Sequence, residues 1–272
     1  MTRVDKDRVV AALAETFLSI TSLCEALTEE EWARPTDCPG WTVKDQVAHM
    51  IGTESALSGL PTPEVDVDRF GYLRNPIGRS NEAWIEERRG REPGVVLGEF
   101  RSITASRLEA LRAMSQAELD ADSSTPAGPD TYGRFVQIRV MDCWVHEQDI
   151  REATDRPGHR EGPAVDVSLD EVVTALGYVV GKQAGAPKGS SVRLELTGGS
   201  SRTVDVVVAD RARVSDRPVD HPTTTLTVPV LVFMRLVGGR VDPARCVADG
   251  SVTVTGDQAL GTRVVENLAY MI

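Results

Sequence analysis

The sequence predicts an α+β protein, in which a helical bundle is followed by a small domain that mixes strands and helices. Through most of residues 5–154 the apolar side chains recur three and four positions apart, the spacing of one helix face. Beyond residue 190 they alternate instead, which is the pattern of a half-buried strand. Between these regions, residues 155–163 are rich in Pro and Gly and form a predicted linker. We therefore place one domain at residues 1–157 and a second at residues 158–272.

The first domain is predicted to contain four substantial helices and a shorter one. Apolar residues such as Leu13 and Phe17 stripe the first helix, and Thr42 with Asp45 forms a capping box that starts the second. The predicted helices cover residues 5–27, 42 onward, 80–89, 97–111 and 132–154, with loops at 61–69 and 121–130. Long crossovers between the four longer helices favour a four-helix bundle, a fold that builds metal sites from inward-facing side chains.

The second domain begins with a predicted helix and then changes to alternating strands. Val192, Leu194 and Leu196 share one face of the first strand, and Gly and Pro residues mark the turns that follow. The predicted strands cover residues 192–196, 204–208, 224–227 and 251–255, and the predicted helices cover residues 168–183, 230–236 and 259–271. The mixture indicates a small α+β domain separate from the bundle.

Composition and charge exclude several classes of partner. The net charge of -11 argues against nucleic acid and anionic membranes, because both require a basic face on the protein. No apolar run reaches the length of a membrane-spanning helix, and the N-terminus lacks the apolar segment of a signal peptide. The 4 cysteines are scattered with no CxxC pair. We therefore expect a cytoplasmic protein that binds neither nucleic acid nor membrane.

A candidate metal site comes from one helical stretch, residues 140–149. Asp142 and His146 are four residues apart, so their side chains lie on one helix face a turn apart, and Asp149 follows on the same stripe. Such a pair can converge on a divalent metal if a third ligand arrives from another helix. His49 is the candidate, because it lies among apolar residues of the helix that starts at Thr42. The hypothesis is an open three-ligand site for zinc or another divalent metal at His49, Asp142 and His146.

The same spacing also has a simpler explanation. An aspartate and a histidine four apart on a helix often occur by chance, and most such pairs are solvated or hydrogen-bonded to each other. The apolar neighbours of both histidines favour the metal hypothesis, because a buried polar side chain needs a partner.

Two motifs together resemble the mycothiol-dependent maleylpyruvate isomerase family, part of the larger DinB-like metalloenzyme superfamily. The segment from Cys38 to His49, CPGWTVKDQVAH, resembles the first signature of that family. Asp142, His146 and Asp149 match its second signature, a carboxylate four residues before a histidine with an aspartate three residues after it. Residues 233–240 and 256–257 resemble the sterol-carrier-like domain of the family, so the resemblance covers nearly the whole chain.

The resemblance implies a fold, a chemistry and partners. The fold would be a DinB-like four-helix bundle followed by a sterol-carrier-like α+β domain. The activity would be that of a zinc-dependent enzyme with mycothiol as thiol cosubstrate, whose thiolate attacks a small-molecule electrophile in a transferase or a cis-trans isomerase reaction. Arg240 is a candidate catalytic residue for the acidic groups of substrate or thiol, since a guanidinium pairs bidentately with carboxylates. Its alternative role is that of a surface arginine on a turn.

One residue departs from the family pattern, which usually has Glu where this chain has Asp142. Either the helices lie closer together, or Asp142 binds the metal more weakly and the site is vacant or water-filled. In the second case Asp149 is an alternative ligand, although the family pattern places it behind the ligands. The departure also supports a second class of function, a non-catalytic binding or regulatory protein with a vestigial metal site. A metal hydrolase is a third alternative, but Glu54 is the nearest candidate base and its spacing from His49 places it off the ligand face.

Overall fold

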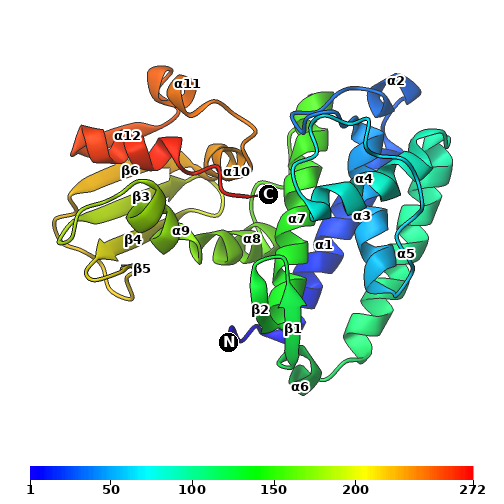
Figure 1. Cartoon of the computed structure of the whole chain (residues 1–272), viewed down its shortest axis with the longest axis horizontal. Helices are drawn as coiled ribbons and strands as arrows, with labels where there is room; N and C mark the ends of the chain where they lie inside the picture. The colour runs from blue at the N-terminus through cyan, green and yellow to red at the C-terminus, as the bar shows by residue number, and fades with distance from the viewer. Residues whose placement is uncertain (272) are drawn as a thin grey trace. The chain divides into compact units, whose positions relative to one another are not determined.

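The structure, a computed structural model, describes residues 1–271 and confirms the α+β class. Its internal contacts divide the chain into two compact units, one from Met1 to Gly158 and one from His159 onward. In Figure 1 the first unit runs from blue to green and is helical, whereas the second runs from green to red and contains a sheet. Each unit is described separately below.

Four helices of the first unit form the predicted bundle (Figure 1). They are α1 (Lys6–Glu25), α3 (Val43–Leu57), α5 (Pro93–Ala113) and α7 (Tyr132–Thr154). Both α1 and α3 pack against α5 and α7, so the four helices enclose a common core. The long side chains buried in this core include Phe17, Ile20, Met50, Phe100 and Trp144.

Polar residues define where these helices begin. Thr42 accepts from the backbone N–H of Asp45 while the Asp45 carboxylate accepts from the N–H of Thr42, the predicted capping box. Thr131 caps α7 by accepting from the backbone N–H of Arg134. The shorter α4 (Pro76–Arg89) begins earlier than predicted, because Asn75 caps it and Pro76 takes the first helical position. Two further short helices, α2 (Glu29–Trp32) and α6 (Gln116–Leu119), complete the helices of this unit.

The prediction that residues 121–130 form a loop is wrong. Strands β1 (Asp122–Thr125) and β2 (Gly128–Thr131) form an antiparallel hairpin there. The connection contains only Pro126 and Ala127, and Gly128 follows with a φ of 101°, a conformation that glycine adopts without strain. The two strands are short and mostly polar, so their sequence lacks the alternation that identifies a strand.

The second unit is built on a five-stranded sheet in the order β5-β4-β3-β6-β7. Strands β3 and β6 are parallel and the other neighbours are antiparallel. The strands are β3 (Ser191–Thr197), β4 (Arg202–Val208), β5 (Ala212–Val214), β6 (Thr224–Pro229) and β7 (Thr253–Gly256). The alternating residues Val192, Leu194 and Leu196 are buried, as predicted.

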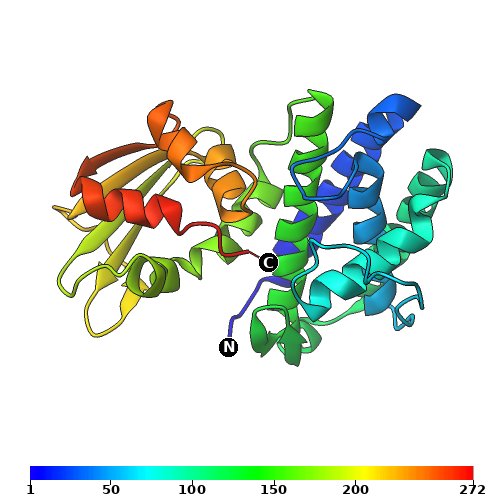
Figure 2. The same ribbon diagram turned by 45° about the horizontal axis from the view of Figure 1, so that its top comes forward.

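The helices of the second unit differ in part from those predicted. Instead of one helix over 168–183, α8 (Pro163–Val173) begins earlier, and α9 (Leu176–Tyr178) leads into a π-helical turn at Val179–Gln183. The last helix, α12 (Gln258–Glu266), ends before the predicted residue 271. Helix α10 (Val230–Val237) follows the prediction, and α11 (Pro243–Ala248) was not predicted. Figure 2 shows α12 lying along the sheet, where it contacts β6 and β7.

Within residues 1–271, no helix combines the length and the apolar character needed to cross a membrane.

Glycine at position 52 allows α4 to approach α3 closely. A Cβ added to Gly52 would lie 2.3 Å from the Cβ of the buried Trp84. We expect Gly52→Ala to destabilise the first unit by about 1–3 kcal/mol through overpacking, although alanine is the better helix former. The matched change Gly98→Ala, in α5, meets no atom within 4 Å and should stabilise by up to about 1 kcal/mol. Urea unfolding followed by tryptophan fluorescence measures both, since all 4 tryptophans lie in the first unit. Equal stability changes in the two variants would contradict the packing argument.

Candidate metal centre

The structure brings the three predicted ligands together between two helices. His49 comes from α3, and Asp142 and His146 come from α7. The His49 Nε2 atom lies 3.3 Å from Asp142 Oδ2, and the His146 Nε2 atom lies 3.5 Å from Asp142 Oδ1. One donor atom from each residue lies within 4.8 Å of the other two. Both histidines are buried and Asp142 is partly exposed, so the carboxylate is the most accessible member.

Asp149 lies on the other side of His146. Its Oδ2 atom is 3.3 Å from the Nδ1 atom of His146, whereas Asp142 faces Nε2 of the same ring. Asp149 is therefore placed to fix the ring orientation and tautomer of His146, the usual role of a carboxylate behind a metal-binding histidine. This geometry favours Asp142 over Asp149 as the residue that completes the donor set.

A buried ion-pair network connects Asp142 to the bundle core. Arg139, one turn before Asp142 on α7, forms an ion pair with Asp142 Oδ2 and donates to Glu54 of α3 at 2.9 Å. Glu54 is fully buried, and its second oxygen lies 3.1 Å from the Nε atom of Arg107 on α5. Two buried arginines thus neutralise two carboxylates, which is what makes this many charges tolerable in a core.

The same network sets the charge states at the site. Burial is the largest influence on His49 and lowers its pKa despite the nearby Asp142. Burial alone would also lower the pKa of His146, but ion pairing with Asp142 and Asp149 raises it. Burial would raise the pKa of Asp142, yet Arg139 and the two histidines hold it well below its usual range. An ionised Asp142 therefore faces a neutral His49, whose Nε2 atom carries the proton that Asp142 Oδ2 accepts.

An aromatic side chain covers both histidines. The Trp41 ring centroid lies 5.2 Å from that of His49 and 5.8 Å from that of His146, with tilts of 37° and 36°. The two imidazoles are 4.7 Å apart in an edge-to-face arrangement. Trp41 stands in the loop directly before α3, within the segment that resembled the family signature.

Two family models together match most of the chain. The model described as the mycothiol maleylpyruvate isomerase N-terminal domain matches residues 13–151, and the model described as the MDMPI C-terminal domain matches residues 166–263. The chain belongs to the mycothiol maleylpyruvate isomerase family. The resemblance inferred from the two sequence motifs is thereby confirmed.

Solved structures of this family share the fold over nearly the whole chain. The crystal structure of the mycothiol-dependent maleylpyruvate isomerase matches with a TM-score of 0.57 at 16% identity, covering 94% of this chain and 96% of that one. A mutant of the same enzyme matches with a TM-score of 0.56 at 16% identity and the same coverage. At this identity the likeness shows the fold.

Two curated relatives are uncharacterized proteins from strains of Mycobacterium tuberculosis. Each is 27% identical over 152 residues, which cover 55% of this chain. The match spans 57% of the length of these relatives.

Arg240, the predicted catalytic residue, lies in the second unit just after α10. Gly239 before it has a φ of 65°, and the Arg240 guanidinium donates to the Gly238 carbonyl at 2.7 Å. This contact holds the side chain near the turn that ends α10. Its role toward substrate remains a prediction.

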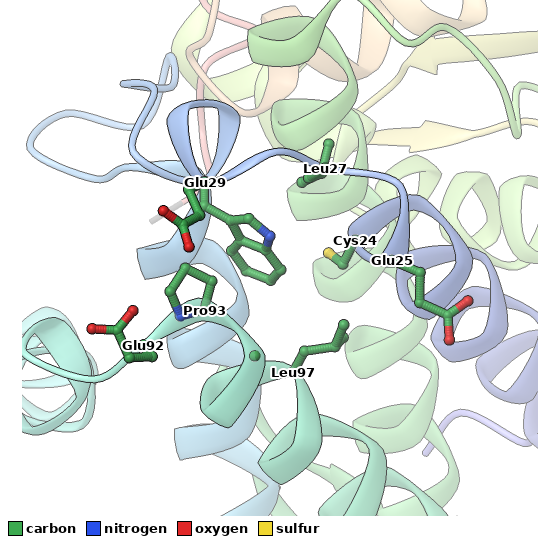
Figure 3. A pocket seen from close by; sticks show the side chains of 9 residues that line it. Cys24, Glu25, Leu27, Glu29, Glu92, Pro93 and Leu97 are labelled. Atoms are coloured by element: carbon green, nitrogen blue, oxygen red, sulfur yellow. The ribbon is translucent and has the colours of Figure 1, made fainter.

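A cavity of about 320 Å³ lies elsewhere in the first unit, between the end of α1 and the start of α5 (Figure 3). Its walls include the apolar Leu27 and Leu97 and the acidic Glu25, Glu29 and Glu92. Its lining contains none of the predicted metal ligands. Acidic walls also suit an anionic thiol or substrate poorly, so this cavity does not identify the reacting site.

Sequence reasoning missed the residues that hold the ligands. Arg139 was detectable as a charge three residues before Asp142 on one helix. Nothing in the sequence indicated that Glu54 and Arg107 would join it, because their pairing connects three helices. Glu54, considered above as a candidate base, lies between these two arginines.

The buried network gives a stability prediction. We expect Arg139→Met to destabilise the first unit by about 3–5 kcal/mol, because it leaves the fully buried Glu54 with only Arg107 as its cation. Arg101→Met, which removes an exposed ion pair with Glu25 in the same unit, should cost at most about 1 kcal/mol. Urea unfolding followed by tryptophan fluorescence measures both. Similar losses in the two variants would show that the buried network contributes no more than a surface pair.

Proposed function

We propose that His49, Asp142 and His146 bind one divalent metal, zinc in preference, and that the chain uses mycothiol to act on a small electrophile. The observation that carries the metal assignment is the spacing of the donor atoms. Bonds of about 2.0–2.1 Å in a tetrahedron place neighbouring ligand atoms about 3.3–3.4 Å apart. Asp142 Oδ2 lies 3.3 Å from His49 Nε2, and Asp142 Oδ1 lies 3.5 Å from His146 Nε2. One donor atom of each residue lies within 4.8 Å of the other two, so small side-chain adjustments bring the set to this spacing. The donor set, two imidazoles and one carboxylate, is also one that zinc accepts.

The surrounding residues are arranged to hold such a donor set. Asp149 orients the His146 ring from behind, and Arg139 keeps the Asp142 carboxylate ionised and fixed. When bound, a metal with three protein ligands supplies an open position where a thiol is converted to thiolate. The burial of both histidines limits competing access by water to their side of the site.

The family supports mycothiol as the thiol. In the isomerase reaction a thiolate adds to one carbon of a conjugated double bond, forming a C–S bond while the electron pair moves to the carbonyl oxygen. The former double bond rotates, and return of the electron pair expels the thiolate and restores the alkene in its trans form. A transferase would retain the C–S bond after protonation of the carbon. Arg240 is proposed to pair with a carboxylate of substrate or thiol.

A second candidate function is that of a binding or regulatory protein with a vestigial metal site. Asp142 favours it, because this carboxylate is shorter than the family's usual Glu and one of its oxygens is already paired with Arg139. A hydrolase is less well supported, since both oxygens of Glu54 are engaged with arginines and not available as a general base.

The metal assignment predicts which histidines matter. We expect about one equivalent of zinc per chain in the wild type and almost none in His49→Ala or His146→Ala, because two protein ligands hold zinc poorly. His159→Ala and His221→Ala, which change the other two histidines of the chain, should retain the metal. Elemental analysis of the purified proteins measures the content. Full retention in His49→Ala and His146→Ala would contradict the site.

Metal binding by variants of Asp142 and Asp149 distinguishes which of the two aspartates is the ligand. Asp142→Ala should abolish tight binding, whereas Asp149→Asn should weaken it by about 10–100-fold through loss of the ion pair behind His146. The reverse order of effects would identify Asp149 as the ligand.

The thiol proposal predicts coupled proton release. At pH 7 a cysteine-like thiol with a pKa of about 8.5 is largely protonated, so its binding as thiolate should release about one proton. Calorimetry of mycothiol binding in two buffers of different ionisation enthalpy measures this number, with the His49→Ala variant as control. The zinc-loaded wild type should also isomerise maleylpyruvate in a mycothiol-dependent reaction. Mycothiol binding without proton release or turnover would favour the binding-protein alternative.

A further inference from the structure

Trp41 lies against both histidines of the candidate metal centre. Its ring centroid is within 6 Å of each imidazole centroid, the range of stacked aromatic contacts. His49 is 4% exposed and His146 is 7% exposed, whereas Trp41 is partly exposed. The indole is therefore part of what separates the two rings from water, and its position affects both.

The indole is held by a buried carboxylate on another helix. The Nε1 atom of Trp41 donates to Glu82 Oε2 at 3.0 Å. Glu82 lies on α4, has no exposed surface, and accepts through Oε1 from the Tyr72 hydroxyl at 2.8 Å. The Arg89 Nη2 atom lies 2.6 Å from the same oxygen and supplies the compensating charge. A buried carboxylate needs such full pairing, so Glu82 is fixed on all sides.

The backbone at Trp41 is fixed separately from its side chain. The Trp41 carbonyl accepts from the backbone N–H of Thr36 at 2.9 Å, and the Trp41 backbone N–H donates to the Cys38 carbonyl at 3.0 Å. Gly40 has a φ of 80°, and a Cβ there would lie 2.3 Å from the Tyr72 ring. These contacts place the Cα of Trp41 but leave both side-chain torsions free. An indole has a single donor, so its bond to Glu82 is the hydrogen bond that orients the ring.

We propose that Glu82 is a positioning residue, which acts through the indole of Trp41 to hold the rings of His49 and His146 in their metal-binding orientation. The consequence for metal affinity rests on the proposed function. The effect on the orientation of the indole and the imidazoles does not rest on the proposed function, because the protein makes these ring contacts through its own residues.

A double-mutant cycle tests the pathway through Trp41. We expect Glu82→Gln to weaken zinc affinity by about tenfold, within the range measured for residues that support metal ligands. Trp41→Phe should weaken it to a similar degree. In the Trp41→Phe background, Glu82→Gln should cause no further loss, because the donor through which Glu82 acts is gone. Competition titration against a chelator of known affinity measures each dissociation constant.

Glu86→Gln is the matched control. Glu86 lies one turn after Glu82 on α4 and pairs with the same Arg89 at 2.9 Å, whereas the Trp41 indole donates to Glu82. Glu86→Gln should leave zinc affinity unchanged. A role of Glu82 limited to stabilising α4 through Arg89 would instead make the two variants alike.

Nuclear magnetic resonance of the metal-free protein separates this inference from the proposed function. The Trp41 indole N–H resonance, identified by its loss in Trp41→Phe, should move in Glu82→Gln, because a neutral amide accepts a weaker hydrogen bond than a carboxylate. The imidazole resonances of His49 and His146 should move with it, and Glu86→Gln should change neither. An unmoved indole resonance, or equal losses from Glu82→Gln with and without Trp41, would overturn the proposal. A wild type that binds no metal would overturn the proposed function while leaving these resonances as the test of Glu82.

Discussion

The ion pair between Glu54 of α3 and Arg139 of α7 is the interaction on which the geometry of the candidate site depends. Glu54 lies five residues after His49, and Arg139 lies three residues before Asp142, so the pair fixes the register of one helix against the other close to the donor atoms. A shift of α7 by one turn, about 5.4 Å, would separate His49 from Asp142 and leave the buried Glu54 with only Arg107 as its cation. The cost of misplacing a buried charge therefore enforces the convergence of the three ligands. Arg107 adds a third helix to the same constraint.

The charges around the donor set also bear on the choice of metal. Asp142 is the single carboxylate among the three donors, and one of its oxygens forms an ion pair with Arg139. Asp149 faces the far side of His146 and contributes its charge through that ring. Hard cations such as Mg²⁺ and Ca²⁺ favour sites rich in oxygen ligands, whereas imidazole nitrogens suit zinc and related metals. Two imidazoles and a shared carboxylate therefore support the proposed choice of zinc over a hard cation.

The sequence predicted the bundle and the shared helix face of Asp142 and His146, because both follow from helical periodicity. That these two residues and His49 bind a metal stays a prediction. The stripe from Leu13 to Phe17, the capping box at Thr42 and the four-residue step from Asp142 to His146 are all local patterns. The sequence pattern predicted a loop where the β1–β2 hairpin lies and extended α12 too far. Short polar strands and fraying helix ends carry weak periodic signals. The supporting residues Glu54, Arg107 and Glu82 were missed for a different reason. Their partners lie on other helices, and pairing across helices leaves no spacing rule in the chain.

Asp142 and Arg139 are best understood together. The family pattern usually has Glu at this position, and its longer side chain would reach the metal position from a more distant backbone. In this chain the shorter carboxylate still lies within 3.5 Å of a nitrogen of each histidine. The ion pair with Arg139 one turn earlier then holds Asp142 in this orientation and keeps it ionised. A residue with few side-chain torsions, fixed by a buried arginine, loses little conformational entropy when it becomes a ligand. The substitution is therefore compatible with a working donor set, because the buried network supplies the rigidity that a short carboxylate needs.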